Sequence, residues 1–264
     1  MMSSKPPHAP TPSRWDRLRR NTRARVALGR AGCGVPVKAN LAFQAAHAGA
    51  RDAVRAALNV EALRAAIASH GWQSVAITSA AVDRDVYLKH PELGRALSEE
   101  SKRELSAPMV APDIAIVLGD GLSAIAVERN AVAVLAALLP KLAEAGLKVG
   151  PIVVATQARV ALADQVGEIM QARLAIMLIG ERPGLSAVDS LGMYLTYAPK
   201  SGRVDSERHC ISNIHAGGLS AAAAAEQAAE LVKLMLLHRC SGVALNGKIG
   251  KVEAAPPRVG SSKK

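Results

Sequence analysis

The chain has 264 residues, of which half are hydrophobic but only six are aromatic, and no run reaches the ~20 uninterrupted apolar residues of a membrane span. Three separate cysteines form neither a CxxC pair nor an even framework, which favours a reducing, cytoplasmic setting. The net charge of +11 comes from the two ends, because residues 1–36 carry +7 and residues 247–264 carry +4. A neutral body lacks the basic folded face of a nucleic-acid-binding domain, so neither nucleic acid nor membrane is an expected partner.

The N-terminal part is predicted to be helical after a short tail. Residues 1–13 are rich in Pro and Ser, which is typical of disorder. Residues 14–71 are expected to form a helical extension whose apolar positions are Leu41, Phe43, Val54, Leu58, Leu63 and Ile67. Residues 15–30 combine arginines with a small apolar stripe. This segment is either a solvated arm or a helix that lies on an acidic partner.

Short apolar runs alternate with helical patterns from residue 72 onward. Strands are predicted at residues 72–78, 113–118, 151–156, 174–179 and 193–197, and helices at residues 124–146, 162–170 and 219–239. Residues 83–107 are polar and are expected to form a surface excursion. The alternation predicts one α/β domain over residues 72–246, with a mostly parallel sheet, flanking helices on both faces and a basic tail at residues 247–264.

Three loops follow strands of this predicted sheet, where open parallel sheets bind ligands. The loop at residues 119–123 reads Gly119-x-Gly121-x-x-Ala124, a relaxed form of the dinucleotide fingerprint. The next strand ends without the carboxylate that would bind a ribose. A nicotinamide-dependent oxidoreductase that uses this turn is therefore kept as an alternative, and a tight turn without any ligand is the other interpretation.

Two more side chains are candidates, each with an ordinary structural explanation. Glu181 opens the loop after the strand at residues 174–179, where it either pairs with Arg182 or accepts hydrogen bonds from a neutral polar ligand. Cys210 lies in the polar segment at residues 207–213, and a lone cysteine is by default an inert thiol. No HExxH motif or Cys/His cluster is present, so no metal is assigned.

Several stretches of the sequence closely resemble the small (light-chain) subunit of ethanolamine ammonia-lyase, an adenosylcobalamin-dependent enzyme family. The resemblance runs from about residue 14 to residue 246, and GERPGLSAVDSLGMYLT is its most specific run. The stretches lie at residues 23–34, 43–54, 83–97, 119–124, 180–196 and 207–214.

The resemblance implies a lyase subunit that converts ethanolamine to acetaldehyde and ammonia only together with a large catalytic subunit, in a higher-order hetero-oligomer. It implies adenosylcobalamin as cofactor and a Rossmann-like cobalamin-binding domain that covers it at the subunit interface. By motif, the cofactor contacts are Val160, Glu181 and Cys210, and no residue of this chain is catalytic. The expected location is the cytoplasm, either free or within a bacterial microcompartment.

One segment bears on how the cobalt would be ligated. Residues 213–218 (NIHAGG) nearly match the Asp-x-His-x-x-Gly pattern by which other cobalamin domains supply a histidine to cobalt. Asn213 stands in place of the aspartate and cannot raise the basicity of the imidazole as a carboxylate does. We therefore expect the cofactor to keep its own base.

Overall fold

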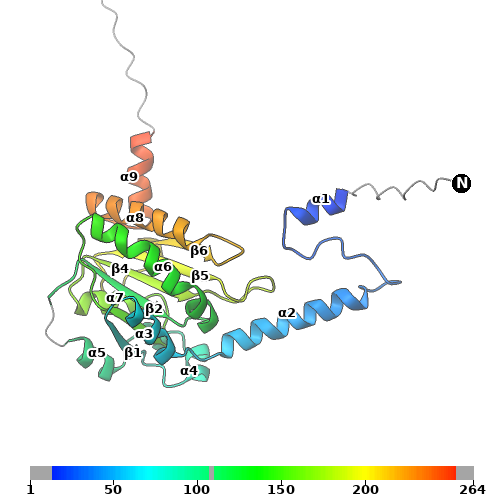
Figure 1. The fold of residues 1–264 in the computed structure, drawn as a ribbon, viewed down its shortest axis with the longest axis horizontal. Coiled ribbons are helices and arrows are strands. Elements are labelled where there is room, and N and C mark those ends of the chain that lie inside the picture. Colours follow the sequence, from blue (N-terminus) through cyan, green and yellow to red (C-terminus); the bar gives the residue numbers. More distant parts are fainter. Residues whose placement is uncertain (1–13, 107–109, 254–264) are drawn as a thin grey trace, which may run out of the picture.

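A computed structural model describes residues 14–106 and 110–253 (Figure 1). The expected disorder of residues 1–13 and the outer part of the basic tail, residues 254–264, lie outside the described residues. The described chain consists of a sheet domain with helices on both faces and an N-terminal arm that leads away from it (Figure 1).

A six-stranded mixed sheet forms the centre of the domain. Its strands are β1 (Ser74–Thr78), β2 (Ile114–Gly119), β3 (Ile152–Thr156), β4 (Leu174–Gly180), β5 (Leu191–Tyr197) and β6 (Arg208–Ile214). The order is β1-β3-β2-β4-β5-β6, in which the first four are parallel, β5 pairs antiparallel with β4, and β6 pairs antiparallel with β5. The predicted α/β class with a mostly parallel sheet is confirmed, and the five expected strands match within about two residues.

The parallel strands have a continuous apolar composition because both of their faces are covered. Every residue of β2 and β4 is buried. Helices on each side of a parallel sheet produce this pattern, whereas a half-exposed strand would alternate apolar with polar residues. The uninterrupted runs are what made these strands predictable from sequence.

The sixth strand corrects the interpretation of residues 207–213 as a polar segment away from the core. In β6, Ile211 and Ile214 are buried in the main core, while Cys210 is exposed. An edge strand packs apolar side chains on one face only, so its overall composition stays polar. The periodicity is also interrupted by a register shift between Leu191 and Met193 of the neighbouring strand β5.

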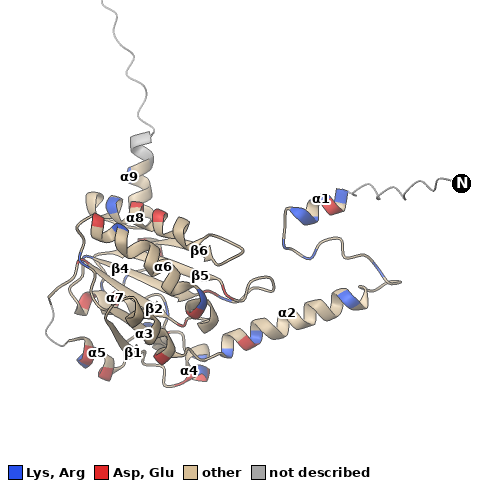
Figure 2. Ribbon diagram, in the orientation of Figure 1, with Lys and Arg blue, Asp and Glu red and all other residues tan. Residues whose placement is uncertain are grey.

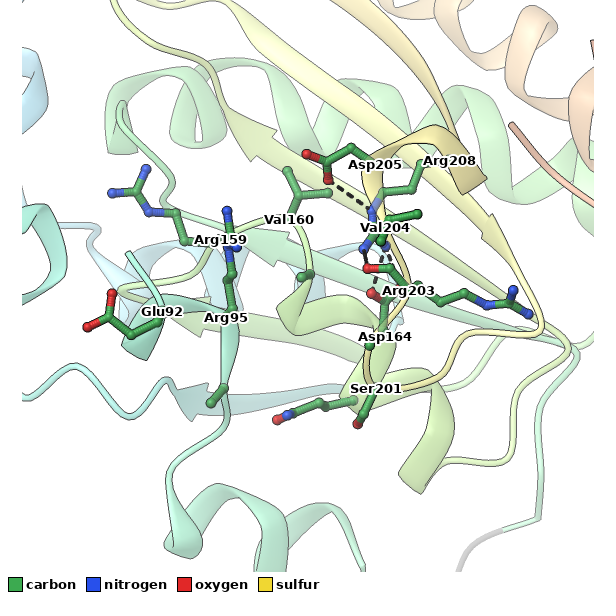
Figure 3. A pocket seen from close by; sticks show the side chains of 14 residues that line it. Glu92, Arg95, Arg159, Val160, Asp164, Ser201, Arg203, Val204, Asp205 and Arg208 are labelled. Atoms are coloured by element: carbon green, nitrogen blue, oxygen red, sulfur yellow. Dashed lines mark hydrogen bonds and ion pairs between the residues drawn. The ribbon is translucent and has the colours of Figure 1, made fainter. Parts of the chain in front are cut away.

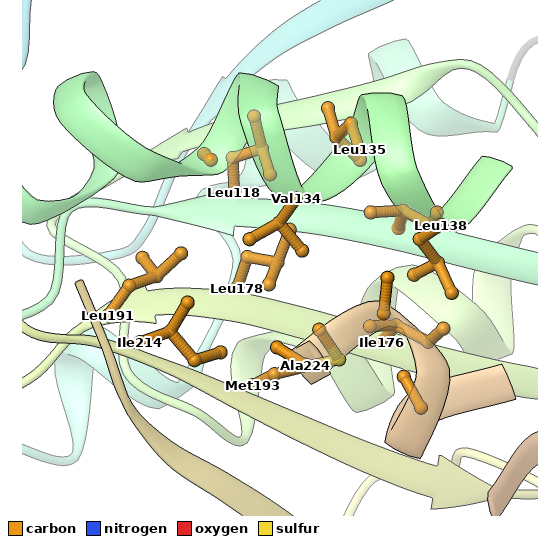
Figure 4. Close-up of a cluster of buried hydrophobic side chains, with 14 of the residues drawn as sticks. Leu118, Val134, Leu135, Leu138, Ile176, Leu178, Leu191, Met193, Ile214 and Ala224 are labelled. Atoms are coloured by element: carbon orange, nitrogen blue, oxygen red, sulfur yellow. The ribbon is translucent and has the colours of Figure 1, made fainter. Parts of the chain in front are cut away.

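Three helices seal one face of the sheet: α3 (Val60–Ser69), α6 (Ala124–Glu144) and α8 (Ala221–His238). Figure 4 shows side chains of α6 and α8 meeting those of β2, β4 and β5 in this cluster. Ala131, Ala224 and Ala228 are fully buried there, and their small side chains let α6 and α8 pack closely. Much of the alanine content therefore serves close packing between helices and sheet.

The opposite face carries a smaller cluster beneath α5 (Glu99–Leu105) and α7 (Leu162–Ile169). α7 lies against β2 and β4. Tyr194 of β5 packs at the margin of this cluster and is half-buried, and its pairing partner Cys210 is exposed. Because directly opposed residues of antiparallel strands share a face, the sheet stays open on this side around Tyr194 and Cys210, whereas the next pair on the same face, Thr196 and Arg208, is buried.

The surface segment expected at residues 83–107 is described as far as residue 106, and most of it lies at the surface while a few side chains pack into the domain. The segment forms α4 (Arg84–Lys89), a short 3-10 turn at Leu93–Arg95, and α5. Asp83 and Ser98 cap the two helices by accepting hydrogen bonds from backbone amides. Tyr87, Leu97 and Leu105 are buried, so the segment covers one end of the sheet with an apolar underside.

The N-terminal segment is helical, but with an interruption at residues 21–36. α1 (Arg14–Arg20) and α2 (Val37–Arg55) form an arm in which only Ala53 is buried (Figure 1). Two contacts return the connecting segment to the domain: the Arg25 guanidinium donates to the carbonyl of Leu185 at 3.2 Å, and the Ser186 hydroxyl donates to the carbonyl of Arg23 at 3.4 Å. The apolar residues of the N-terminal segment differ in burial. Leu58, Leu63 and Ile67 are buried, whereas Leu41 and Phe43 are exposed.

The C-terminal helix α9 (Val243–Glu253) crosses the boundary predicted at residue 246. Figure 2 shows that α1 carries more basic than acidic residues, with Asp16 among its arginines, and that α4, α5 and α8 also carry both signs of charge. Among the described helices, none is long and apolar enough to cross a membrane.

Candidate functional site

The carboxyl ends of the four parallel strands meet at one edge of the sheet, as their common direction requires. The Gly119–Ala124 turn follows β2, Val160 lies four residues after β3, and Glu181 directly follows β4. The β5–β6 hairpin lies beside this edge and contributes Tyr194 and Cys210 from its open face. These segments form the candidate site.

The glycine turn after β2 is closed by the chain itself. A Cβ atom on Gly121, whose φ is +55°, would lie 2.2 Å from the carbonyl oxygen of Gly180. The Leu122 amide donates to that same oxygen at 2.9 Å, and the fully buried Ser123 caps α6 and donates to the carbonyl of Val188 at 2.6 Å. The glycines are thus required for close approach to the end of β4. The end of β4 and Val188 therefore contact this turn where the nicotinamide alternative would place a pyrophosphate.

A buried carboxylate in that turn holds the neighbouring loop. Asp120 is 2% exposed and accepts hydrogen bonds from the amides of Gln157 and Ala158, both at 2.9 Å. The guanidinium of Arg84 lies 3.2 Å from it. Burial raises the pKa of Asp120, and the two amides and Arg84 oppose that shift. Asp120 therefore fixes the loop that leads to Val160, a role that sequence analysis did not identify.

Tyr87 connects this network to the loop after β3. It is fully buried, its hydroxyl donates to the carbonyl of Ala158 at 3.0 Å, and burial raises its pKa to about 12. Arg84 and Arg159 lie over the ring at 4.6 and 4.2 Å from its centroid. Arg84 also donates to the carbonyl of Val54 at 2.7 Å, so the same residue holds the end of α2.

Glu181 is held by hydrogen bonds, not by the expected ion pair with Arg182. One of its oxygens accepts from the Ser190 hydroxyl at 2.5 Å and from the Asn213 amide at 3.3 Å. Within residues 14–106 and 110–253, Glu181 makes no ion pair, and its other oxygen accepts no hydrogen bond. That second oxygen lies above Gly192, where a Cβ atom would approach it to 3.0 Å. The carboxylate is therefore oriented and retains a free acceptor.

Cys210 and Tyr194 lie side by side on the open face. They are paired across β5 and β6, and each influences the ionisation of the other. Burial raises the pKa of the Cys210 thiol; the Tyr194 hydroxyl lowers it, and the charge of Glu181 raises it. The structure thus brings Glu181 and Cys210 together around Tyr194, which sequence analysis did not single out.

Val160 lies apart from that pair, in a pocket of about 590 Å³ (Figure 3). The pocket extends from the turn after β3 to the loop between β5 and β6, and Val160 packs against the same apolar cluster as Tyr194. Asp205 lines the pocket and also acts electrostatically on Tyr194. Val160 therefore lies on the same side of the sheet as Tyr194, at the margin of the same apolar cluster.

A buried ion pair forms part of the lining of this pocket. The Arg208 guanidinium lies 2.6 and 2.7 Å from the two carboxylate oxygens of Asp164, and both side chains are no more than 3% exposed. Arg208 also donates to the hydroxyl of Thr196 and to the carbonyl of Arg203. Burial raises the pKa of Asp164, and Arg208 opposes that shift. The pair joins α7 to the β5–β6 hairpin.

His215 has both ring nitrogens occupied within its own turn. One nitrogen lies 2.9 Å from the amide oxygen of Asn213, and the other accepts from the Gly217 amide at 3.2 Å. The residue is 7% exposed. Over the described part of the chain, no group of three or more His, Cys, Asp or Glu side chains could hold a metal ion.

The fold and this edge define a class: an α/β domain of the kind that binds a nucleotide or another large cofactor at the carboxyl ends of its strands. Comparison with known proteins specifies it further. The family described as "Ethanolamine ammonia-lyase light chain (EutC)" matches residues 12–246. The chain belongs to this family and is therefore a small subunit of an ammonia-lyase.

Curated relatives named ethanolamine ammonia-lyase small subunit agree over nearly their whole length. The protein of Xanthomonas campestris pv. campestris is 46% identical over 259 residues, which cover 97% of this chain and 93% of the relative. That of Bradyrhizobium diazoefficiens is 49% identical over 247 residues, covering 93% and 94%. That of Rhodopseudomonas palustris is 50% identical over 230 residues, covering 86% and 88%. The resemblance inferred from sequence motifs is confirmed.

Proposed function

We propose that this chain binds adenosylcobalamin at the carboxyl edge of its sheet and covers it against the large subunit of ethanolamine ammonia-lyase. The assembled enzyme then converts ethanolamine to acetaldehyde and ammonia. One observation carries the proposal: Glu181, Tyr194, Cys210 and Val160 lie on the side of the sheet that is partly open beside the strand ends, whereas the opposite face is sealed by helices. An open face with oriented polar groups is a ligand surface.

The residues present suit the chemistry of the cofactor. Adenosylcobalamin supplies the radical chemistry once bound, and its corrin ring carries neutral side-chain amides that donate hydrogen bonds. One carboxylate oxygen of Glu181 is fixed by hydrogen bonds from the Ser190 hydroxyl and the Asn213 backbone amide, and the other is free to accept a hydrogen bond from a ligand. Cys210 and Val160 provide small, weakly polar contact area on either side of Tyr194. This chain thus orients the cofactor and excludes water from it.

We assign no catalytic residue to this chain. Its carboxyl edge offers acceptors and apolar contacts, but its buried titratable groups are engaged in internal pairs, as Asp164 is with Arg208 and Asp120 with Arg84. The groups that react with ethanolamine are then supplied by the large subunit. We also place the enzyme in the cytoplasm, free or within a microcompartment, which the free thiols of Cys33, Cys210 and Cys240 support.

The proposed activity is tested by reconstitution. We expect acetaldehyde release from ethanolamine with adenosylcobalamin only when this chain and its large subunit are combined. Activity of the large subunit alone at the same rate would remove this chain from the reaction. No activity, with both chains folded and the cofactor intact, would contradict the assignment.

The cofactor contact is tested separately by titration. Glu181→Ala should weaken binding of adenosylcobalamin to the assembled enzyme by about tenfold, since a hydrogen bond to a charged group contributes ~1.5–3 kcal/mol. Glu226→Gln is the matched control, because Glu226 lies on α8 over the opposite face and pairs with Lys141. Equal dissociation constants for Glu181→Ala and the wild type would remove Glu181 from the site.

A further inference from the structure

The pocket beside Val160 contains arginines whose charge the chain does not neutralise. Arg95 lines the pocket and is exposed, and its side chain makes no hydrogen bond or ion pair within the described residues. Arg159 donates to the carbonyl of Tyr87 at 3.2 Å, while its buried Nε atom has no acceptor. Figure 3 shows Arg95 extending toward Val160, whereas the guanidinium of Arg159 points away from Val160, toward the Tyr87 ring that it covers.

The other charged groups of the pocket are engaged elsewhere or turned away. Asp164 is bound by Arg208, and Asp205 lies 3.5 Å from the Nε atom of Arg208. Arg203 pairs with Glu207, which does not line the pocket. Glu92 is near His90 at 3.3 Å, and its carboxylate points away from Val160 in Figure 3. Among the described residues that line the pocket, Arg95 and Arg159 are therefore the two cations without a carboxylate partner, and Arg95 is the one whose side chain reaches toward Val160.

The backbone adds to this preference for an anion. The turn that precedes α7 leaves the amides of Val160 and Ala161 without an acceptor in the described residues, and no side chain caps the helix. The N-terminus of a helix favours negative charge through its free amides and its dipole. Two guanidinium groups and these amides around one opening form a surface that suits an oxygen anion.

We propose that Arg95 and Arg159 form an anion-binding subsite for the phosphodiester of the cobalamin nucleotide loop. This inference rests on the proposed function, because it assumes that the cofactor lies against Val160. Adenosylcobalamin carries one anionic group, this phosphodiester, while its corrin side chains are neutral amides. The pocket volume of about 590 Å³ is in the range of small-molecule sites and accommodates a phosphodiester with its sugar.

The test compares two cofactors in the assembled enzyme by equilibrium dialysis. Adenosylcobinamide lacks the nucleotide loop and its phosphodiester. Arg95→Ala should raise the dissociation constant for adenosylcobalamin by about tenfold and leave that for adenosylcobinamide unchanged. Arg95 is the preferred variant because it has no internal partner to lose. Arg173→Ala is the matched control, since Arg173 pairs with Asp113 at the amino edge of the sheet.

The outcomes separate this inference from the proposed function. Failure of the wild-type assembly to retain adenosylcobalamin would contradict the proposed function itself. Normal wild-type binding with an unchanged dissociation constant for Arg95→Ala would overturn the subsite alone. Equal weakening for both cofactors would also overturn it, because Arg95 would then act on a part of the cofactor other than the phosphodiester.

A salt titration gives a second readout if adenosylcobinamide binds too weakly to measure. Exposed charge pairs are screened by salt. Binding of adenosylcobalamin by the wild type should therefore weaken with ionic strength more steeply than binding by Arg95→Ala. Parallel salt curves would overturn the subsite.

Discussion

The two faces of the sheet are built from the same strands but differ in what they leave exposed. Under α6 and α8, successive inward residues of β5 such as Met193 and Leu195 are fully buried. On the other face, α7 covers the parallel strands, while Tyr194 and Cys210 remain accessible. The first face carries the larger apolar core. The second combines a smaller core and a buried ion pair with accessible polar groups, so it is the face that can contact a ligand.

The largest expected loss of stability comes from removing the buried ion pair between Arg208 and Asp164, which lies on the same side of the sheet as Tyr194 and Cys210. Arg208→Ala leaves Asp164 charged and unpaired in the interior, so we expect a loss of about 3–5 kcal/mol in the free energy of unfolding. Denaturant unfolding measures it. Arg129→Ala is the control, because its pair with Asp189 is exposed and contributes at most about 1 kcal/mol. If both variants lost the same small amount, the pair would not anchor the hairpin.

The next largest loss of stability is expected on the face that α6 and α8 cover. Leu135 of α6 is fully buried, so Leu135→Ala should cost about 3 kcal/mol through lost apolar burial and the cavity that remains. Leu237 of α8 is 73% exposed, and Leu237→Ala should lie within about 0.5 kcal/mol of the wild type. Thermal or denaturant unfolding of both variants is the measurement. A similar cost for the two leucines would mean that this face is not the principal core.

The sequence predicted those elements whose signal is local. β2 and β4 are continuous apolar runs, and α6 and α8 are long alanine-rich helices, so their type follows from composition and length. β6 was missed because an edge strand with Arg208 and Cys210 reads as polar. The exposure of Leu41 and Phe43 was also missed, because helical periodicity does not say whether a partner face exists within the chain.

The candidate site was predictable only in part for the same reason. Motifs located Val160, Glu181 and Cys210, whose roles remain predictions. The contacts around them join distant segments: Arg84 reaches Asp120, and Glu181 is held by the amide of Asn213, 32 residues further along. The spacing of these residues in the sequence does not predict such contacts. They arise from the strand order, which brings the ends of β2, β3 and β4 to one edge.

A smaller expected effect concerns the rate at which the Cys210 thiol is alkylated. Since burial raises the pKa of Cys210, its alkylation by iodoacetamide should be slow near neutral pH and should accelerate only at a higher pH than that of an exposed thiol. Tyr194→Phe removes the hydroxyl that lowers this pKa, so alkylation should become a few-fold slower at a given pH. Peptide mass spectrometry resolves Cys210 from Cys33 and Cys240. Faster alkylation in Tyr194→Phe would contradict the assigned interaction.

The smallest effect lies at the amino edge of the sheet, away from the candidate site. The pKa of Asp113 is lowered by the Lys148 amide, which donates to it at 2.9 Å, and further by Arg173. A carboxylate whose pKa is lower in the folded state stabilises above the unfolded pKa near 4, and this stabilisation disappears as the pH falls through the folded pKa. Asp113→Asn should therefore lose at most about 1 kcal/mol at pH 7, because the Arg173 pair is partly exposed, and should converge with the wild type in acid. Stability curves that stay parallel between pH 7 and pH 2 would contradict this, and cofactor binding should be the same in both proteins.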